Sequence, residues 1–442
     1  MVPDSPQLSI RVCIVGGGLV GLAGSILLRR QGFDVTVLER DTTLETAGYG
    51  IQLHPNGVRV LQDMGVYERL LPKATKGRTI VLRAYDTGRV MHEQDLSELE
   101  SEYGAPVLTL HRAHLRECLY EAAVTEGVRI HMGTGVEVSG IDVAGARVIP
   151  CSYADGGSHG CAIEADLFIG ADGIGSAVRT AMAGPETDIN PHGQVVNRMA
   201  VDKSAVRAIP SLRHFADESS ICLWMGPGGH VVVYTLHGTM YIAYVQPWSS
   251  RVQDAFFGAQ KVDLAELRAA LFGWDPEVHK LVNLSPDGKC DRRMLFEPPS
   301  HDFPWVSDGN KFCLVGEAAH QILPYLSQGA AQGLESISVL TYLLGKAKSS
   351  GDFPKCLSLY QQMRKERIGH ASRASRKSGR LWQLADGAAR DERDQELLSS
   401  QPPTVGHPNL LADPFFQSWL WGFDARRAVD EVWSAESTQT KE

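Results

Sequence analysis

The 442-residue sequence lacks the features of metal sites, disulfide scaffolds and membrane spans. Its eight cysteines are scattered without a Cys-x-x-Cys pair, and its histidines show no metal-ligand spacing, which argues against zinc and against a disulfide framework. No apolar run approaches the roughly 18 residues that a membrane-spanning helix needs. Residues 1–8 hold two prolines and one acidic residue in place of a basic and apolar secretory signal. We therefore expect a cytoplasmic enzyme with no metal and no membrane span.

Positive charge is also in deficit. The chain has 43 Lys and Arg residues against 52 Asp and Glu residues, a formal net charge of −9, which argues against nucleic acid as its main partner. Hydrophobic residues make up 43% and charged residues 21%, as is usual for a globular protein with a large core. At about 150 residues per domain, the length predicts two or three domains or one large interleaved α/β body.

Residues 9–39 carry the clearest local motif. They predict a β-strand, a glycine-rich turn, a helix and a second β-strand, with Gly16, Gly18 and Gly21 in the pattern G-x-G-x-x-G and Glu39 at the end of the second strand. In this arrangement the pyrophosphate of a dinucleotide lies at the helix N-terminus, and the acid accepts hydrogen bonds from ribose hydroxyls. The alternative, that the glycines only permit close packing, leaves Glu39 unexplained. The motif does not distinguish NAD from FAD.

Later apolar runs predict two sheets. Residues 166–170 and 311–316 are short apolar runs that end in glycine and predict further strands of the first, parallel sheet. Residues 195–202, 219–225 and 230–246 predict an inserted, mostly antiparallel sheet, with a hairpin turn at His237-Gly238. Residues 354–386 predict a long amphipathic helix. A solvated face is favoured over a nucleotide-phosphate surface for its basic residues, Arg364, Lys365, Arg367, Arg373, Arg376, Lys377 and Arg380.

Two further segments read Ile169-Gly170-Ala171-Asp172-Gly173-Ile174-Gly175-Ser176-x-x-Arg179 and Leu314-Val315-Gly316-Glu317-Ala318-Ala319-His320. They resemble the second and third fingerprints of class A, aromatic-ring FAD monooxygenases. The three fingerprints stand in the family's order, and residues 48–56, 110–115 and 323–330 extend the similarity over nearly the whole chain. Within the family, the chain is most similar to salicylate hydroxylases, 6-hydroxynicotinate 3-monooxygenases and fungal secondary-metabolite monooxygenases.

This resemblance implies an α/β fold. Residues 1–180 and 290–350 would form a Rossmann-like FAD domain of the GR2, p-hydroxybenzoate-hydroxylase type. Residues 181–289 would form an inserted, mostly antiparallel β-sheet substrate domain, and residues 351–442 a C-terminal helical region. The chain would act as a monomer or homodimer.

The resemblance also implies an activity. NADH or NADPH would bind transiently and reduce FAD, O2 would form a C4a-hydroperoxide, and its distal oxygen would hydroxylate an aromatic or phenolic small molecule. Three alternatives stay open: epoxidation of an alkene or indole in natural-product biosynthesis, a flavin halogenase, which the sequence disfavours because it lacks the W-x-W-x-I-P segment, and a non-catalytic flavoprotein sensor.

The residues expected to contact FAD follow from matching positions. Arg112 would reach the pyrophosphate or ribityl region, Asp172 and Glu317 would lie beside the cofactor, and backbone N–H groups at residues 328–330 would face the flavin pyrimidine. The full predicted set is Gly16, Gly18, Gly21, Glu39, Arg40, Gly50, Arg112, Asp172, Glu317, Gln328, Gly329 and Ala330. The alternatives are a surface charge for Arg112 and a helix N-cap for Asp172. Most members have Asp where this chain has Glu317.

The predicted catalytic residues are Arg198, Tyr234, His230 and Pro324, and the predicted substrate contacts are Tyr49, Gln52, Arg198, His230 and Tyr234. His230 and Tyr234 are four apart, which puts both on the same face of a strand. Alternatively, His230 and Tyr234 are core residues whose hydrogen bonds are made within the protein, and Tyr49 fills a gap in its loop. Gln52 replaces a histidine of the hydroxynicotinate enzymes and cannot take a proton at neutral pH. His54 and His320 are expected to be structural.

Overall fold

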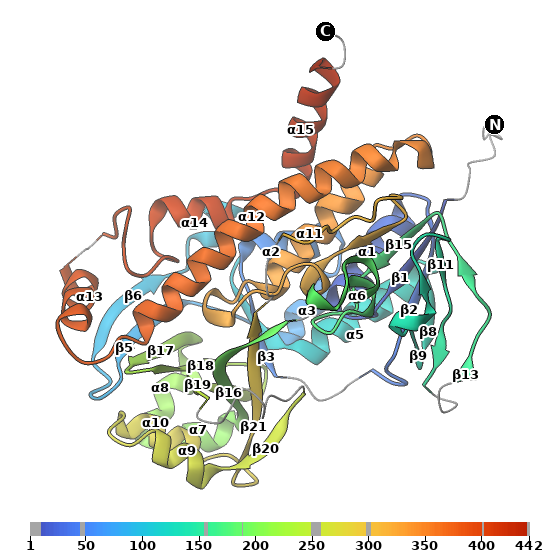
Figure 1. Cartoon of the computed structure of the whole chain (residues 1–442). Coiled ribbons are helices and arrows are strands. Elements are labelled where there is room, and N and C mark those ends of the chain that lie inside the picture. The colour runs from blue at the N-terminus through green and yellow to red at the C-terminus, as the bar shows by residue number, and fades with distance from the viewer. Residues whose placement is uncertain are drawn as a thin grey trace.

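A parallel sheet of five strands carries the glycine motif (Figure 1). All neighbouring strands in it are parallel. The strands predicted at 166–170 and 311–316 are confirmed as members of this sheet. Its spatial order is β22 (Phe312–Leu314), β15 (Leu167–Gly170), β1 (Arg11–Val15), β2 (Asp34–Glu39) and β8 (Arg129–Met132).

The computed structural model of the chain describes residues 10–44, 49–153, 158–187, 189–248, 258–297, 302–399 and 402–439. Gly48, which belongs to one of the segments used for the resemblance, lies outside the described residues.

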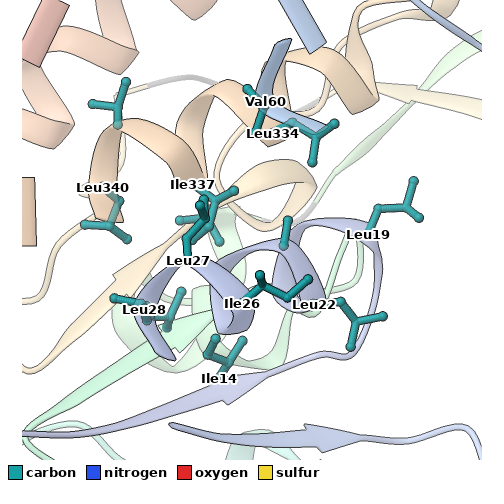
Figure 2. Close-up of a cluster of buried hydrophobic side chains, with 14 of the residues drawn as sticks. Ile14, Leu19, Leu22, Ile26, Leu27, Leu28, Val60, Leu334, Ile337 and Leu340 are labelled. Atoms are coloured by element: carbon teal, nitrogen blue, oxygen red, sulfur yellow. The ribbon is translucent and has the colours of Figure 1, made fainter. Parts of the chain in front are cut away.

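Helix α1 (Leu19–Arg30) packs between this sheet and α11 (Gly329–Leu344), as Figure 2 shows. A Cβ atom on Gly24 would lie 2.6 Å from the side chain of Ile337, so glycine allows the two helices to approach closely. Each large apolar side chain buried here stabilises the fold by about 1.5–3 kcal/mol. The packing therefore fixes the position of α11, which begins at predicted cofactor contacts. The side chains shown in this layer include Ile14, Leu22, Ile26, Leu27, Leu334 and Ile337.

The second sheet has eight strands and is mostly antiparallel, as predicted. The hairpin predicted at His237-Gly238 joins two of its strands. The spatial order is β20 (Gln260–Asp263), β21 (Lys289–Glu297), β16 (Asn190–Asp202), β19 (Thr239–Pro247), β18 (Gly229–Thr235), β17 (Ser220–Gly226), β5 (Thr79–Ala84) and β6 (Val90–Asp95).

The second sheet extends beyond the range 181–289 that was predicted for the substrate domain. Strands β5 and β6 come from the segment assigned to the FAD domain, and β5 pairs in parallel with β17. This pairing satisfies backbone groups along β17 that would otherwise form an exposed sheet edge. Alternation within short strands cannot show that a distant segment completes the sheet.

The two faces of the second sheet have different neighbours. On one face, Trp224, Val231 and Ile242 pack among four short helices, α7 (Lys203–Ala208), α8 (Arg213–Asp217), α9 (Leu264–Ala270) and α10 (Pro276–Val282). On the other face, Tyr234 and Tyr241 belong to a cluster that includes side chains from the C-terminal region. The second face is therefore the one that the rest of the chain covers.

The C-terminal region is helical, with α12 (Phe353–Trp382), α13 (Ala388–Ser399), α14 (Pro414–Trp421) and α15 (Ala425–Gln439). In Figure 1, α12 runs across the molecule and α15 projects away from it. The prediction of a solvated basic face on α12 holds for Arg373, Lys377 and Arg380 but is wrong for Arg364 and Arg367. Those two side chains are buried, because they pair with Glu335 of α11. Among the described residues, no helix combines the length and hydropathy needed to cross a bilayer.

The remaining elements connect these parts. The helices are α2 (Pro55–Asp63), α3 (Tyr67–Leu70), α4 (Leu99–Tyr103), α5 (Arg112–Thr125) and α6 (Ala177–Ala183). Two 3-10 turns, η6 (Gly316–Ala318) and η7 (Pro324–Leu326), precede α11. The strands are β3 (Gly50–Leu53), β4 (Ala74–Lys76), β7 (Leu108–His111), β9 (Thr134–Gly135), β10 (Ile141–Asp142), β11 (Arg147–Val148), β12 (Cys151–Ser152), β13 (Ser158–His159) and β14 (Ile163–Glu164).

Candidate functional site

The three glycines of the first motif have different roles. Gly16 has φ of +107°, and a Cβ atom there would overlap the carbonyl of Ala171. A Cβ atom on Gly21 would overlap the carbonyl of Gly16. A Cβ atom on Gly18, the residue before α1, would meet no described atom within 4 Å. Gly16 and Gly21 are therefore needed for packing, whereas Gly18 borders open space at a helix N-terminus, where a pyrophosphate fits.

Glu39 is buried and held toward this turn. Its Oε2 accepts a hydrogen bond of 2.7 Å from the Gly17 amide, and its Oε1 accepts one of 2.8 Å from the Asp41 amide. Arg116 of α5 forms an ion pair of 3.1 Å with Glu39 and also donates to the Gly17 carbonyl at 3.1 Å. A carboxylate has further lone pairs, so Glu39 can still accept from ribose hydroxyls. Sequence reasoning missed Arg116, and the only signal was its place one helical turn after Arg112.

The second fingerprint folds around Asp172. Its carboxylate accepts hydrogen bonds from the Ser176 hydroxyl at 2.5 Å and the Val178 amide at 3.2 Å. Burial raises the pKa of Asp172, and these hydrogen bonds oppose the rise. Ser176 in turn caps α6 by accepting from the Arg179 amide at 2.9 Å. Asp172 thus supports the start of α6, but Ser176 is the N-cap of that helix, so the N-cap alternative for Asp172 is wrong and its contact with FAD stays a prediction.

Three predicted cofactor contacts are exposed charged side chains, Arg40, Arg112 and Glu317. Arg112 begins α5, and its amide donates to the Tyr49 carbonyl at 3.1 Å. Within the described parts of the chain, neither the Arg112 guanidinium nor the Glu317 carboxylate has a hydrogen-bond or ion-pair partner. Both groups are therefore available to a ligand, and their roles stay predictions.

The N-terminal turn of α11 presents its backbone rather than its side chains. The Gln328 side chain is buried and points inward, because its Nε2 lies 3.0 Å from His54 Nδ1 and its Oε1 accepts from Asn56 at 3.0 Å. The amides of Gly329 and Ala330 belong to the first turn, where an α-helix supplies no acceptor. A Cβ atom on Gly329 would meet no described atom within 4 Å. Such free amides beside open space fit the electron-rich edge of a flavin.

The segment before α11 connects to the strand that follows the first motif. Ser327 has φ of +53° and its hydroxyl donates to Gln52 Oε1 at 3.2 Å. Pro324 is exposed at the start of η7. Burial lowers the pKa of His54 to about 4, so its imidazole is neutral at pH 7. His54 is thus structural, as expected, whereas Gln52 and Pro324 remain predicted site residues.

On the covered face of the second sheet, an arginine and several tyrosines lie against the start of β3. The Arg198 guanidinium carbon lies 5.6 Å from the Tyr49 ring centroid. The ring centroids of Tyr49 and Tyr241 are 6.2 Å apart, and those of Tyr234 and Tyr241 are 4.9 Å apart. A Cβ atom on Gly50 would lie 2.7 Å from the Tyr234 hydroxyl oxygen. The structure therefore brings Arg198, Tyr234 and Tyr49 together at a sheet junction, where the eight-stranded sheet meets the start of the three-stranded sheet β3-β7-β4.

Three polar groups of this junction lack protein partners. Burial raises the pKa of Tyr234 and Tyr241, while the Arg198 charge opposes the rise for both. Neither phenol makes a hydrogen bond to any described residue, and Arg198 Nε is buried without a partner. Because a buried nitrogen normally has a partner, the unpaired Arg198 Nε indicates a ligand position, and the phenols of Tyr234 and Tyr241 share its face of the sheet. Tyr241 was missed by sequence reasoning, although it lies opposite Tyr234 in the predicted hairpin.

His230 lies on the same strand face as Tyr234 but has different neighbours. Its Nδ1 lies 2.9 Å from Gln383 Nε2, and its ring packs against Tyr325 at 5.7 Å and Trp382 at 5.4 Å. Burial lowers the pKa of His230 to about 3, so the imidazole is neutral at pH 7. These contacts favour the core alternative given from the sequence over a substrate contact.

The described residues contain no group of three or more His, Cys, Asp or Glu side chains arranged to hold a metal ion. The features that fit a ligand are instead the open glycine turn, the acid beside it and the free amides of α11. They fit the pyrophosphate, ribose and flavin of FAD, and the donors at the sheet junction lie on three strands of the eight-stranded sheet, β16, β18 and β19.

Comparisons with known proteins agree with this geometry. Residues 9–272 match the family model described as "FAD binding domain". The chain is 29% identical over 427 residues to the FAD-dependent monooxygenase OpS4 of Beauveria bassiana, covering 96% of this chain and 97% of the relative. It is 32% identical over 396 residues to 3-amino-4-hydroxybenzoate 2-monooxygenase of Streptomyces cremeus, covering 89% of this chain and 93% of the relative. A salicylate hydroxylase substrate complex superimposes with a TM-score of 0.76 at 20% identity, covering 96% of this chain and 98% of that one.

Proposed function

The chain belongs to the FAD binding domain family of FAD-dependent monooxygenases, and on that premise we propose that it hydroxylates a small aromatic carboxylate held by Arg198, Tyr234 and Tyr241. The predictions of fold class, FAD, NAD(P)H, O2 and monooxygenase activity are confirmed by this membership. The substrate and the residues that bind it are the part we propose.

The observation that carries the proposal is the set of unpaired donors at the sheet junction. Arg198 Nε and the phenols of Tyr234 and Tyr241 are donors, and the two phenols stay protonated because burial raises their pKa. A carboxylate or phenolate accepts from a guanidinium and from phenols in strong, charge-assisted hydrogen bonds. The similarity to an aminohydroxybenzoate monooxygenase supports the same class of substrate, an aromatic ring with an acidic group.

Bound FAD would supply the hydride acceptor and the site of O2 activation. The chain would hold it with the open turn at Gly18, with Glu39 and with the amides of Gly329 and Ala330, and Arg112 would neutralise phosphate charge. Tyr49, and Gly50 that follows it at the start of β3, would close the junction between flavin and substrate and exclude water, which prevents loss of reduced oxygen as H2O2.

The site lacks an obvious general base among the described residues. Gln52 is an amide, and His54 and His230 are buried with lowered pKa. We therefore propose a ring that is already electron-rich through a hydroxyl or amino group and whose orientation is set by the donors. Arg198 would lower the pKa of a bound phenol by its charge, so that no proton has to be taken by a side chain.

The test compares 3-hydroxybenzoate and 3-amino-4-hydroxybenzoate with their neutral carboxamides. Purified protein should oxidise NADH or NADPH at least tenfold faster with the carboxylates, and mass spectrometry should show a product heavier by one oxygen. Equal stimulation by carboxamides would contradict the proposed handle. Stimulation by indoles or alkenes alone, with epoxide products, would favour the epoxidase alternative.

The proposal includes a cytoplasmic location and a monomer or homodimer. Cell fractionation and size-exclusion chromatography with light scattering test these two points.

A further inference from the structure

A buried carboxylate on α11 is surrounded by donors from three helices. Glu335 is 1% exposed, and its two oxygens accept five hydrogen bonds of 2.6–3.0 Å. Arg364 and Arg367 of α12 hold its Oε2 at 2.8 and 2.7 Å. The donors to Oε1 are Asn56 of α2, Gln332 of α11 and Arg367.

The charges of this cluster do not cancel. Among the described residues, Glu335 is the one carboxylate that pairs with either guanidinium. The other donors of Arg367 go to the carbonyls of Trp419 and Leu420. Arginine stays protonated in proteins, and although burial raises the pKa of Glu335, Arg367 and Arg364 lower it to about 2. Two positive charges and one negative charge leave a net charge of +1 in the interior.

The cluster is connected to the N-terminal turn of α11 by side-chain amides. Asn56 Nδ2 donates both to Glu335 at 2.6 Å and to Gln328 Oε1 at 3.0 Å. Gln332 Nε2 likewise donates to Glu335 at 3.0 Å and to Gln328 at 3.2 Å. Arg364 donates to Gln332 Oε1 at 2.7 Å. The cluster is therefore joined to the turn whose free amides begin the helix through Glu335 and through the Arg364–Gln332 hydrogen bond, and the positive end of the helix dipole adds to its excess positive charge.

We propose that Arg364 and Arg367 are positioning residues that raise the midpoint potential of bound FAD through the Gln332, Asn56 and Gln328 amides. FAD gains negative charge on reduction, and charge near its ring system tunes its potential. A buried positive charge acts more strongly than a surface one, because the interior screens it less. A higher potential makes hydride transfer from NAD(P)H more favourable. This inference rests on the proposed placement of FAD against the first turn of α11.

The test measures the midpoint potential of the FAD-loaded protein by spectroscopic titration against reference dyes. Arg367→Gln should lower the ratio of reduced to oxidised FAD at a fixed potential about tenfold, which is about 30 mV for a two-electron couple. Arg367→Lys keeps the charge while losing the same two-pronged geometry, so it is the matched control and should stay close to wild type. Equal shifts in both variants would overturn the inference, because geometry rather than charge would then be responsible.

Glu335→Gln gives the opposite prediction. It makes the cluster more positive and should therefore raise the midpoint potential. The proposal can be tested even if only one of the variants Arg367→Gln and Glu335→Gln folds. Arg376→Gln, at a half-exposed arginine further along α12, should leave the potential unchanged. No aromatic substrate is present in this measurement. A wrong substrate assignment would therefore not change the measured midpoint potential. A midpoint potential that does not change when the charge of the cluster changes would overturn only this inference.

Discussion

The hydroxyl oxygen of Tyr234 lies 2.7 Å from the point where a Cβ atom on Gly50 would stand. Gly50 begins β3, a strand of the three-stranded sheet β3-β7-β4, whereas Tyr234 belongs to the eight-stranded sheet. This contact joins the two parts of the proposed site, since the Tyr241 ring also lies 2.9 Å from the same point. Glycine is needed at position 50 because the Tyr234 and Tyr241 rings approach its backbone closely, not because the backbone adopts an unusual φ angle.

Gly50→Ala should therefore disturb the substrate side of the site. The added methyl group must displace the Tyr234 and Tyr241 rings, at a cost of about 1–3 kcal/mol in the free energy of unfolding. The KM for the aromatic substrate should rise. Chemical denaturation and steady-state kinetics measure the two effects. In a double-mutant cycle with Tyr234→Ala, the added cost of Gly50→Ala should be smaller than in the wild-type background, because one of the two clashing rings is then absent.

The glycine motif offers a contrast between two neighbouring positions. Gly18→Leu should abolish FAD binding with little change in the melting temperature of the apoprotein, because its side chain enters open space. Gly21→Leu should prevent folding, because the side chain would overlap the Gly16 carbonyl. Fluorescence titration with FAD and thermal melts of the apoprotein separate the outcomes. Loss of both properties in Gly18→Leu would mean that this position is packed rather than open.

Much of the fold could be predicted from the sequence because its signals are local. The βαβ unit, the strands ending in glycine and the hairpin at His237-Gly238 each depend on residues close in sequence. The addition of β5 and β6 to the second sheet could not be predicted, since pairing between segments 79–84 and 220–226 leaves no mark in either. The same holds for Arg364 and Arg367, which look like a solvated helix face until Glu335 is placed beside them.

The site could be predicted only where a motif fixes the position. Glu39 follows from the length of the βαβ unit, whereas its partner Arg116 comes from a helix that lies far along the chain and returns to the turn. Strand alternation correctly placed His230 and Tyr234 on one face, but it could not show that Trp382 of α12 packs against His230. Tyr241 shares that face, and only the strand register reveals it.

Arg198→Ala should uncouple NAD(P)H oxidation from hydroxylation. Without the guanidinium, a substrate carboxylate loses its charged donor and the ring is poorly oriented, so NAD(P)H consumption should persist while product falls and H2O2 rises. An oxygen electrode with catalase and product chromatography give the ratio. Arg198→Lys should retain part of the coupling because it keeps the charge.

Removing either unpaired phenol should weaken substrate binding. Tyr241→Phe and Tyr234→Phe should each cost about 1–3 kcal/mol, seen as a rise in KM or a fall in kcat/KM. Tyr244→Phe is the matched control, because this neighbouring tyrosine of β19 donates to the Ala270 carbonyl at 3.3 Å among the short helices on the opposite face. Equal effects in all three variants would show a general loss of packing rather than loss of a substrate contact.

Glu317→Asp should leave FAD affinity intact or improve it. Glu317 is exposed in η6, and the shorter acid restores the length that most family members use at this position. Fluorescence titration with FAD measures the affinity. A tenfold loss, about 1.4 kcal/mol, would show that this chain has adapted to the longer side chain, and Glu317→Gln would then tell whether length or charge is required.

The last prediction decides between a core role and a substrate role for His230. Burial lowers its pKa from 6.5 to about 3, so the folded protein keeps this imidazole neutral while the unfolded chain takes up a proton below pH 6.5. The unfolded state then binds more protons, so the free energy of unfolding should fall as the pH drops from 6.5 toward 3, by at most about 1.4 kcal/mol per pH unit for this residue.

His230→Gln should be less stable at pH 7 because packing is lost, yet its free energy of unfolding should fall less steeply as the pH drops below about 6.5. The matched control is His131→Gln, which removes an exposed histidine of β8 and leaves His230 in place. Urea unfolding at several pH values measures the slopes. An unchanged slope in His230→Gln would mean that the imidazole can be protonated in the folded protein, which requires access to solvent or ligand, and the residue would return to the substrate face.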